Sequence, residues 1–196
     1  MIETKKQLKE FINYEKILYG KKHKYVLLPR MSEKSIIWKY ICLLRLEEYS
    51  YNTNHKLRYI FYKFLRLKMS RKYLIQIPKN VVDKGLKIFH VSPTIINAKK
   101  IGKNLMLGPN VYMVAQGRTG DSPTLGDDIA IGASATLVGG INLASGIAIG
   151  ANSLVNKSFE EENITIAGNP AKKINSNGSK SWGGTRIFKS VEKLKR

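Results

Sequence analysis

The 196-residue sequence predicts a mainly β protein, a parallel β-helix that is preceded by an α-helical region and followed by a short basic tail. The main observation is an aliphatic residue that recurs every six positions in LGDDIAIGASATLVGGINLASGIAIGANSLV, at Leu125, Ile131, Leu137, Leu143, Ile149 and Val155. An α-helix needs a period near 3.6 and an amphipathic strand a period of 2. A period of six is typical of short strands joined by turns, with three strands in each turn of a triangular coil.

The six-residue register extends backwards through four more aliphatic residues: Met113, Leu107, Ile101 and Ile95. The gap from Met113 to Leu125 keeps the phase, so the intervening VAQGRTGDSPT is expected to project as a loop. A second set, four positions on, is expected to help fill the coil: Leu105, Val111, Ile129, Ile141 and Ile147. A sandwich of Gly-rich alternating strands is the alternative, and ten aliphatic positions on one phase argue against it.

The chain divides into three parts: a helical region over residues 1–80, the repeat domain over 81–174 and a basic tail over 175–196. Within the first part, Ser32 is the expected N-cap of a helix that runs to about Glu48. Residues 3–18 predict a weaker helix. After a turn of Asn and Thr, another helix carries an apolar face of Leu57, Ile60, Phe61, Phe64 and Leu65.

The net charge of +20 is concentrated outside the repeats. A polybasic surface suits nucleic acid, anionic lipid or the phosphates of a cofactor. No nucleic-acid-binding module accompanies it, so nucleic acid is not the expected partner. The tail SWGGTRIFKSVEKLKR predicts either disorder or a basic amphipathic helix from about Ile187, and the helix would suit peripheral contact with an anionic membrane.

The remaining composition excludes several classes. The single cysteine, Cys42, permits no intramolecular disulfide, and no Cys/His cluster has zinc spacing, so no metal is expected. The N-terminal MIETKKQLKEFINYEK lacks the apolar core of a signal peptide. The longest apolar stretch, IIWKYICLLRL, is interrupted by charge and is too short to span a bilayer. The expected location is the cytoplasm, with peripheral membrane contact left open.

Two further segments resemble a known family. The repeats followed by AGNPAKKI, from Ala167 to Ile174, are similar to the hexapeptide-repeat acyltransferases, whose fold is a left-handed parallel β-helix. GLKIFHVSPTIINAKKIGKN, with the preceding helices and IPKN, resembles serine acetyltransferases, especially the short serine-acetyltransferase-like proteins of polysaccharide biosynthesis. The resemblance covers roughly residues 33–178. It implies acetyl-CoA as co-substrate and a homotrimer or a dimer of trimers.

Acetyl transfer from a thioester to a hydroxyl needs a base and hydrogen-bond donors for the developing oxyanion. Histidine suits the base at neutral pH. His23, in GKKHKY, and His55, in NTNHK, are expected to lie on the surface. His90 begins the strand pattern in KIFHVSPTII and occupies the position of the catalytic histidine in the serine acetyltransferase motif, so we predict that it is the general base. Cys42 lies in an apolar helix pattern and is not expected to carry the acyl group.

The sequence departs from the serine acetyltransferase pattern at two positions. The family has Asp where this chain has Phe89, and it has a second histidine where GDSPTLG has Ser122. The resemblance ties both groups to serine recognition and to acid/base chemistry. Their absence makes a hydroxyl of a sugar or polysaccharide precursor a competitor of L-serine as acceptor. A non-catalytic β-helix scaffold or binding module is the alternative from another class.

The resemblance also implies acceptor-binding residues. Arg45 and Glu48, in LLRLEEYSYN, match a helical segment that approaches the acceptor in relatives, and a helical salt bridge explains them as well. Arg118 and Asp121 are the charged members of the inserted loop, which in the family closes over the active site at a subunit boundary. Solvated loop charges are the alternative for these two.

The donor groove is expected along the later turns of the coil. The resemblance implies that backbone groups near Gly132, Ala133 and Gly150 bind the pantetheine arm as an extended strand would be bound. Lys172 and Lys173 are the expected partners of the coenzyme A phosphates. No P-loop or GxGxxG motif indicates a nucleoside triphosphate or NAD.

Overall fold

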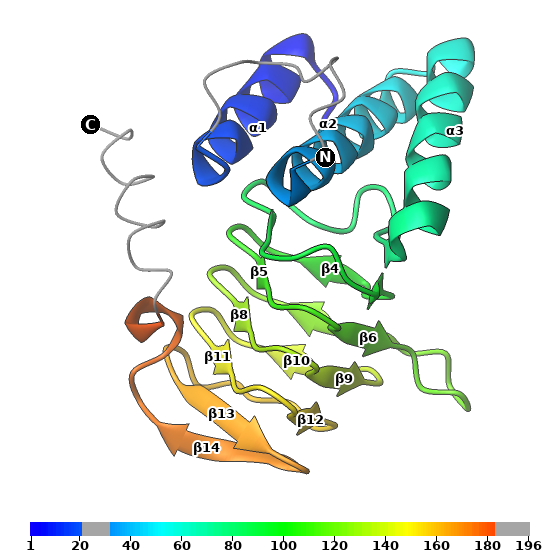
Figure 1. Cartoon of the computed structure of the whole chain (residues 1–196). Helices are drawn as coiled ribbons and strands as arrows, with labels where there is room; N and C mark the ends of the chain where they lie inside the picture. Colours follow the sequence, from blue (N-terminus) through cyan, green and yellow to red (C-terminus); the bar gives the residue numbers. More distant parts are fainter. Residues whose placement is uncertain (21–31, 183–196) are drawn as a thin grey trace.

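The computed structural model describes residues 1–20 and 32–182. Three helices form its N-terminal part: α1 (Lys5–Leu18), α2 (Glu33–Asn52) and α3 (Lys56–Tyr73). They lie together at one end of a stack of short strands, and β13 and β14 lie at the other end (Figure 1). The structure therefore confirms the helical N-terminal region. The predicted tail helix from Ile187 lies outside the described residues.

Local polar contacts fix the ends of the helices. Thr4 caps α1 with a capping box, in which its hydroxyl accepts from the Gln7 backbone N–H at 3.1 Å. Ser32 is the N-cap of α2, as predicted, but its hydroxyl makes no capping bond and lies 2.8 Å from the hydroxyl of Ser35. The helix extends to Asn52, beyond the expected end at Glu48.

In the described part of the chain, fourteen short strands follow the helices: β1 (Ile75–Gln76), β2 (Lys87–Ile88), β3 (Thr94–Ile96), β4 (Lys100–Ile101), β5 (Met106–Leu107), β6 (Tyr112–Val114), β7 (Thr124–Leu125), β8 (Ala130–Ile131), β9 (Thr136–Val138), β10 (Asn142–Leu143), β11 (Ala148–Ile149), β12 (Leu154–Val155), β13 (Thr165–Gly168) and β14 (Ala171–Asn175). They form a five-stranded sheet (β1-β3-β6-β9-β12), a three-stranded sheet (β10-β7-β4) and a six-stranded sheet (β14-β13-β11-β8-β5-β2). All described pairings are parallel except β13 with β14.

From β2 to β12, successive strands fall on different sheets, so the chain visits the three sheets in turn and then returns to the first. Thr124 pairs with Asn142 and Ala130 with Ala148, which is a return every 18 residues. The spacing is three times the six-residue period. From Met106 to its partner Ala130 the spacing is 24, because the loop after β6 adds one six-residue unit to that turn. This loop projects from the strands in Figure 1.

Nine of the ten predicted aliphatic positions are buried, and the second predicted set is buried with them. The exception is Ile95, where the prediction was wrong. Ile96 points into the core and pairs with Met113, while Ile95 is only half-buried. The turn between Ile96 and Ile101 is one residue shorter than the others, and this shifts the inward position by one.

Helix α3 has the predicted apolar face, but this face points away from the core. Leu57, Ile60, Phe61 and Phe64 are all more than half exposed. The side of α3 that packs on the protein carries Arg66, whose guanidinium is paired with the Glu47 carboxylate of α2 and donates to the Ile77 carbonyl at 3.2 Å.

Candidate functional site

His90 lies at a corner of the stack, where the chain leaves β2 of the six-stranded sheet and enters β3 of the five-stranded sheet. Its neighbours hold the backbone on both sides. The Ile88 N–H donates to the Tyr19 hydroxyl at 2.7 Å, and the Phe89 N–H donates to the Leu107 carbonyl at 3.0 Å. The His90 side chain itself is 62% exposed, so a solvent-borne molecule reaches it directly.

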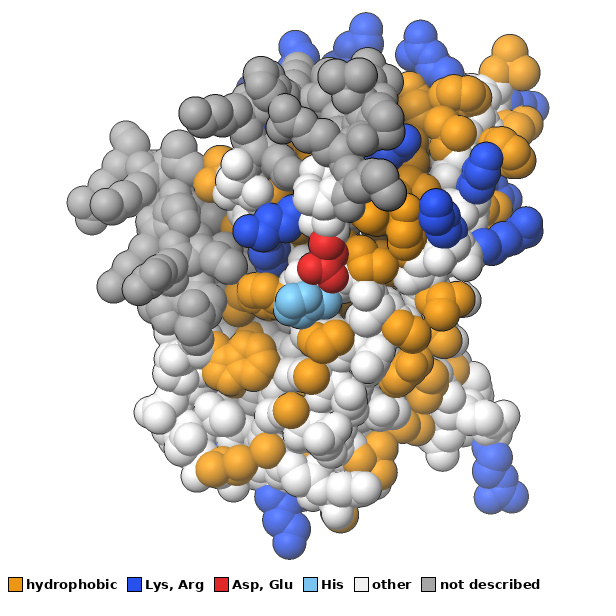
Figure 2. All heavy atoms as spheres, viewed as in Figure 1, with side chains coloured by type: hydrophobic (Ala, Val, Ile, Leu, Met, Phe, Trp, Pro, Cys, Tyr) orange, Lys and Arg blue, Asp and Glu red, His pale blue; other side chains and the backbone are white. Residues whose placement is uncertain are grey.

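The residue that orients His90 is Glu33, at the start of α2. One carboxylate oxygen lies 3.3 Å from His90 Nδ1, and the other accepts from the Val91 N–H at 2.7 Å. Figure 2 shows a histidine and an acidic side chain in contact on this face, where the helices meet the stacked strands. The contact directs Nδ1 to the carboxylate, and the described residues offer Nε2 no partner.

Sequence reasoning missed Glu33. It is 57 positions from His90 and belongs to no motif that joins the two. The only available signal was an acidic residue in the first turn of a predicted helix, which is common at helix N-termini for electrostatic reasons.

The corner that holds His90 begins a column of equivalent corners. The Phe89 N–H donates to a carbonyl of the next turn, and three glycine N–H groups do the same at equivalent corners. Their N···O distances are all 2.8 Å: Gly108 to Ile131, Gly132 to Ile149 and Gly150 to Ile166. The residues one position later therefore form a line through successive turns: His90, Pro109, Ala133 and Ala151. The structure brings the predicted donor residues Gly132, Ala133 and Gly150 into one line with His90.

This column has no room for larger side chains. A Cβ added at Gly132 would lie 2.5 Å from the Ala151 nitrogen, and one at Gly108 would lie 2.8 Å from the Ala133 nitrogen. The glycines therefore let successive turns stack closely, and one position later Ala133 is half-buried and Ala151 is exposed. Within the described part of the chain, the N–H groups of Ala133 and Ala151 have no hydrogen-bond acceptor, so they can donate to an extended ligand.

The two predicted phosphate-binding lysines lie on β14, at the end of the stack that is remote from the helices. Lys172 pairs with Ala167, which is the next level of the corner column after Gly150. Its side chain is exposed. Lys173 is bonded through Nζ to the Glu161 carboxylate at 2.6 Å, so part of its charge is already neutralised.

Arg45 and Glu48 lie in the interior, at the junction of the helices with the strands. Arg45 donates to Glu48 at 2.9 Å and to the carboxylate of Glu15 at 2.5 Å, and both side chains of the Arg45–Glu48 pair are at most 2% exposed. Its remaining donors bond the backbone carbonyls of Val82 and Asp83 at 2.8 Å. No Arg45 donor is left for an acceptor, and no described contact joins this pair to His90.

The electrostatics of this junction follow from burial. Burial acts to lower the pKa of Arg45, but the Glu15 and Glu48 carboxylates outweigh that effect and raise the pKa above its usual range. Burial also raises the pKa of Glu48, and the charge of Arg45 opposes that rise. The predicted salt bridge of Arg45 with Glu48 is thus present, but it is buried.

Arg118 and Asp121 are exposed on the loop after β6. The loop closes on itself, since the Gln116 N–H donates to the Asp121 carbonyl at 2.9 Å. The Ser122 hydroxyl lies 3.4 Å from the Asn97 side-chain oxygen. This loop follows the C-terminal end of β6 in the five-stranded sheet, whereas His90 precedes the N-terminal end of β3 in the same sheet. Within one chain, the structure does not bring them together.

The other reactive side chains lie elsewhere. Cys42 is buried in α2, and burial raises the pKa of its thiol to about 12, so the thiol is neutral at physiological pH. His55 precedes α3, with Nδ1 2.7 Å from the Thr53 carbonyl. His23 lies outside the described residues.

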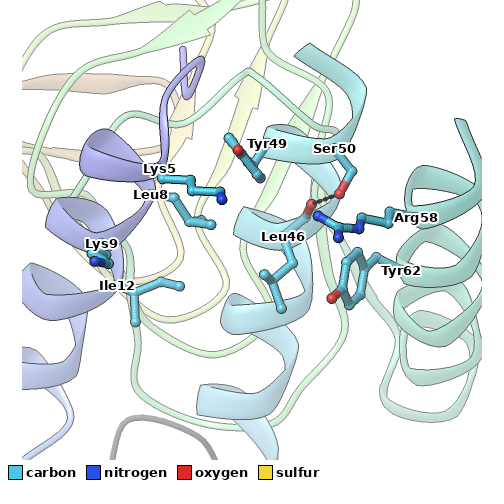
Figure 3. A pocket seen from close by; sticks show the side chains of 9 residues that line it. All are labelled: Lys5, Leu8, Lys9, Ile12, Leu46, Tyr49, Ser50, Arg58 and Tyr62. Carbon is cyan, nitrogen blue, oxygen red and sulfur yellow. Dashed lines mark hydrogen bonds between the residues drawn. The ribbon is translucent and has the colours of Figure 1, made fainter. Parts of the chain in front are cut away.

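A separate hollow of about 220 Å³ lies among the three helices (Figure 3). Its lining includes three cations, Lys5, Lys9 and Arg58, together with Tyr49 and Tyr62. The lining contains no acidic residue and no histidine, so it supplies positive charge without a candidate base.

Serine acetyltransferases recur among both the curated proteins and the solved structures that this chain resembles. No protein-family model matches the chain. The chain is 28% identical to the serine acetyltransferase of Buchnera aphidicola over 148 residues, which are 70% of this chain and 51% of that protein. The chain spans about half or less of the length of the curated serine acetyltransferases it matches.

Solved structures give the same result over more of the chain. The serine acetyltransferase of Neisseria gonorrhoeae superposes with a TM-score of 0.68 and 25% identity, over 91% of this chain and 71% of that chain. A serine acetyltransferase of Brucella abortus, solved in complex with coenzyme A, has a TM-score of 0.65 and 20% identity, over 89% and 70% of the two chains. The chain is therefore similar in sequence and in fold to serine acetyltransferases, as its motifs predicted.

Proposed function

We propose that this chain is an acetyl-CoA-dependent O-acetyltransferase of the serine-acetyltransferase-like type, with His90 as general base. The observation that carries the proposal is the column of corners. An exposed histidine with an oriented ring stands at the head of a line of corners in which the Ala133 and Ala151 N–H groups are free to donate. A base beside an extended backbone groove is what direct transfer from a thioester requires.

In the proposed reaction, His90 Nε2 removes the proton from the acceptor hydroxyl as its oxygen attacks the thioester carbonyl. The new C–O bond forms, and backbone N–H groups stabilise the oxyanion. The C–S bond then breaks, and the proton held by His90 passes to the departing thiolate, so coenzyme A leaves as the thiol. Glu33 holds Nδ1 and stabilises the positive charge that the ring carries between these steps.

The donor is proposed to lie along the column. The pantetheine amides would bond Ala133 and Ala151, beside Gly132 and Gly150, and the phosphates would reach Lys172, with Lys173 shared with Glu161. The coenzyme A complex of the Brucella relative supports this choice of donor.

We favour a hydroxyl of a sugar or polysaccharide precursor as the acceptor, with L-serine as the competitor. The ammonium group of serine calls for a carboxylate, and the position before His90 offers the half-buried ring of Phe89. Ser122 replaces the second family histidine and faces Asn97. Relatives from Neisseria gonorrhoeae and soybean have been solved in complex with serine, so the test includes L-serine.

We also propose that the site is shared between copies in a homotrimer or a dimer of trimers. His90 and the loop with Arg118 and Asp121 lie beyond opposite ends of the strands of one sheet, and a strand of three residues is itself about 10 Å long. A neighbouring copy can place its loop beside His90, where these charges would meet the acceptor. Arg45 and Glu48 would support the acceptor side from the junction, without touching the acceptor.

The remaining proposals concern the whole chain. The coil is proposed to be a left-handed parallel β-helix over residues 81–174, with the helical region at 1–80 and the basic tail at 175–196. The protein is proposed to act in the cytoplasm, with the tail as a peripheral membrane contact.

The test is thiol release from acetyl-CoA with L-serine and then with a panel of sugars. His90→Ala should lower turnover by at least about a hundredfold on the preferred acceptor. His55→Ala is the matched control and should leave it unchanged. Wild-type turnover in His90→Ala would remove the central assignment. No transfer to any acceptor, with no acetyl-CoA binding by calorimetry, would favour a non-catalytic scaffold.

A further inference from the structure

Helix α3 is packed with its apolar face outward. Leu57 is 86% exposed, Phe64 65%, Ile60 62% and Phe61 57%. The side toward the protein holds Arg66, which is 7% exposed and paired with Glu47. A surface helix of a globular protein normally shows the opposite arrangement. The cost of exposing four large apolar side chains indicates that something covers this face.

Basic side chains surround the apolar face. α3 contains seven Lys or Arg residues and no Asp or Glu: Lys56, Arg58, Lys63, Arg66, Lys68, Arg71 and Lys72. At 100° per residue, Lys68 and Arg71 continue the line of Leu57 and Phe64 through the last two turns. Lys56 and Lys63 flank that line on one side. The outer face is therefore apolar in its first half and cationic in its second.

The neighbourhood of α3 extends both properties. Tyr51, at the end of α2, is 48% exposed and lies 5.2 Å from the ring of Tyr59, with Lys79 Nζ 4.3 Å from the Tyr51 ring centre. On the side of α3 that faces the other helices, Arg58 joins Lys5 and Lys9 in the cationic hollow of Figure 3. Aromatic and basic side chains at the edge of an apolar face are typical of helices that lie in a membrane interface.

We propose that α3 docks this chain on an anionic lipid surface, with Leu57, Ile60, Phe61 and Phe64 inserted among the acyl chains and the lysines and arginines at the headgroup phosphates. This docking does not depend on the proposed activity. No helix among the described residues is long and apolar enough to cross a bilayer, so the contact is with one surface.

Charge favours lipid over a second copy of the chain. In a parallel pair of α3 helices, the cationic halves would face each other. In an antiparallel pair, Lys68 and Arg71 of each helix would be buried against the apolar half of the other, without a carboxylate from either helix. An anionic membrane satisfies both halves at once, because apolar area and cations each add to its binding.

The test is co-sedimentation of the full chain with phosphatidylcholine vesicles that contain or lack phosphatidylglycerol, at about 0.1 M salt. We expect wild-type protein to sediment only with the anionic vesicles. Lys68→Glu/Arg71→Glu should weaken the partition at least roughly thirtyfold, and Leu57→Ser/Phe64→Ser roughly tenfold or more. All four side chains are exposed, so the variants should keep the wild-type circular dichroism spectrum.

Matched controls make the same kinds of substitution away from α3, and so test whether the position of the substituted residues matters. Lys99→Glu/Lys100→Glu makes the same charge change on the strands, and Ile174→Ser removes an apolar side chain that is 61% exposed on β14. Both should bind vesicles as the wild type does. The proposal fails if wild-type protein stays in solution, or if the α3 variants bind as well as wild type, which would move the contact to another part such as residues 183–196. It also fails if these variants dissociate an oligomer while vesicle binding is unchanged.

Discussion

At the scale of single residues, the proposed chemistry depends on how one imidazole is held. The side chain of His90 is exposed at a corner of the stack, so packing does not fix its position. Its order comes from the two oxygens of Glu33, one at the ring and one at the Val91 N–H. The same carboxylate thus fixes both the side chain and the backbone of the proposed base.

We expect Glu33→Gln to lower kcat roughly tenfold or more while KM for acetyl-CoA stays near wild type. Glutamine keeps an acceptor for the Val91 N–H but removes the negative charge opposite the ring. Glu33→Ala should cost more, because both contacts are lost. Steady-state kinetics at several pH values give the readout. If both variants lose thermal stability, and their loss of kcat is no larger than the loss of folded protein explains, Glu33 has a purely structural role.

The buried thiol of Cys42 should make the free energy of unfolding depend on pH. Its pKa is raised by burial from 9.0 to about 12, so the unfolded thiol ionises first as pH rises. The stability that this group contributes is fully present below pH 9 and is lost as pH rises toward 12. By pH 10.5 the loss should be about 2 kcal/mol. Urea unfolding at pH 8 and pH 10.5 should show a smaller drop in Cys42→Val, and equal drops in both proteins would contradict the assignment.

At the scale of elements, two features position the proposed site. The first is the junction where α1 and α2 meet the first turn of strands, held by the buried Arg45 with Glu15 and Glu48. The second is the corner column, where glycines let successive turns approach without side chains between them. The junction positions Glu33 through α2, and the column aligns the Ala133 and Ala151 N–H groups, which have no acceptor among the described residues.

Arg45→Leu should lower the free energy of unfolding by about 3–5 kcal/mol, because it leaves two buried carboxylates without their cation. Arg58→Leu replaces a side chain of α3 that is exposed; it is the control and should change the free energy of unfolding by less than about 0.5 kcal/mol. Chemical denaturation of both variants measures the difference. A small effect for Arg45→Leu would mean that water or another group reaches the carboxylates.

Gly132→Val should weaken acetyl-CoA binding at least roughly tenfold, because a Cβ there would lie 2.5 Å from the Ala151 nitrogen and would displace the backbone of the groove. Gly117→Val is matched, since a Cβ at Gly117 meets nothing within 4 Å. Calorimetry with acetyl-CoA on folded protein gives the comparison. Equal affinity in the two variants would place the donor elsewhere.

At the scale of the whole molecule, the arrangement of sheets separates His90 from the loop that was expected to join it. A shared site in an oligomer predicts complementation. His90→Ala and Arg118→Ala/Asp121→Ala should each be nearly inactive, and a co-refolded equal mixture should recover about a quarter of wild-type activity, the fraction of random pairs that combine two intact halves. No recovery, with mixed oligomers confirmed by mass spectrometry, would place the site within one chain.

Much of the fold was predictable because the repeat is local. Inward aliphatic residues at a fixed spacing define each turn, and nine of ten positions follow it. The exception is Ile95. The next turn is one residue shorter than the others, and this is seen only in the structure, where Ile96 instead of Ile95 pairs with Met113. His90 is proposed as the base on the strength of its motif. Glu33 was not predicted, because its contact spans 57 positions and depends on how α2 docks on the strands.

The sequence by itself determined the three-sided stack, the projecting loop, the helical N-terminal region and the likeness to serine acetyltransferases, because each is a matter of period, composition or motif. Tertiary structure alone decided which side of each helix is buried. It buried Arg45 with Glu48, paired Glu33 with His90 and turned Leu57 and Phe64 of α3 outward. An amphipathic pattern states that a helix has two faces, but only the packing of its neighbours determines which face they cover.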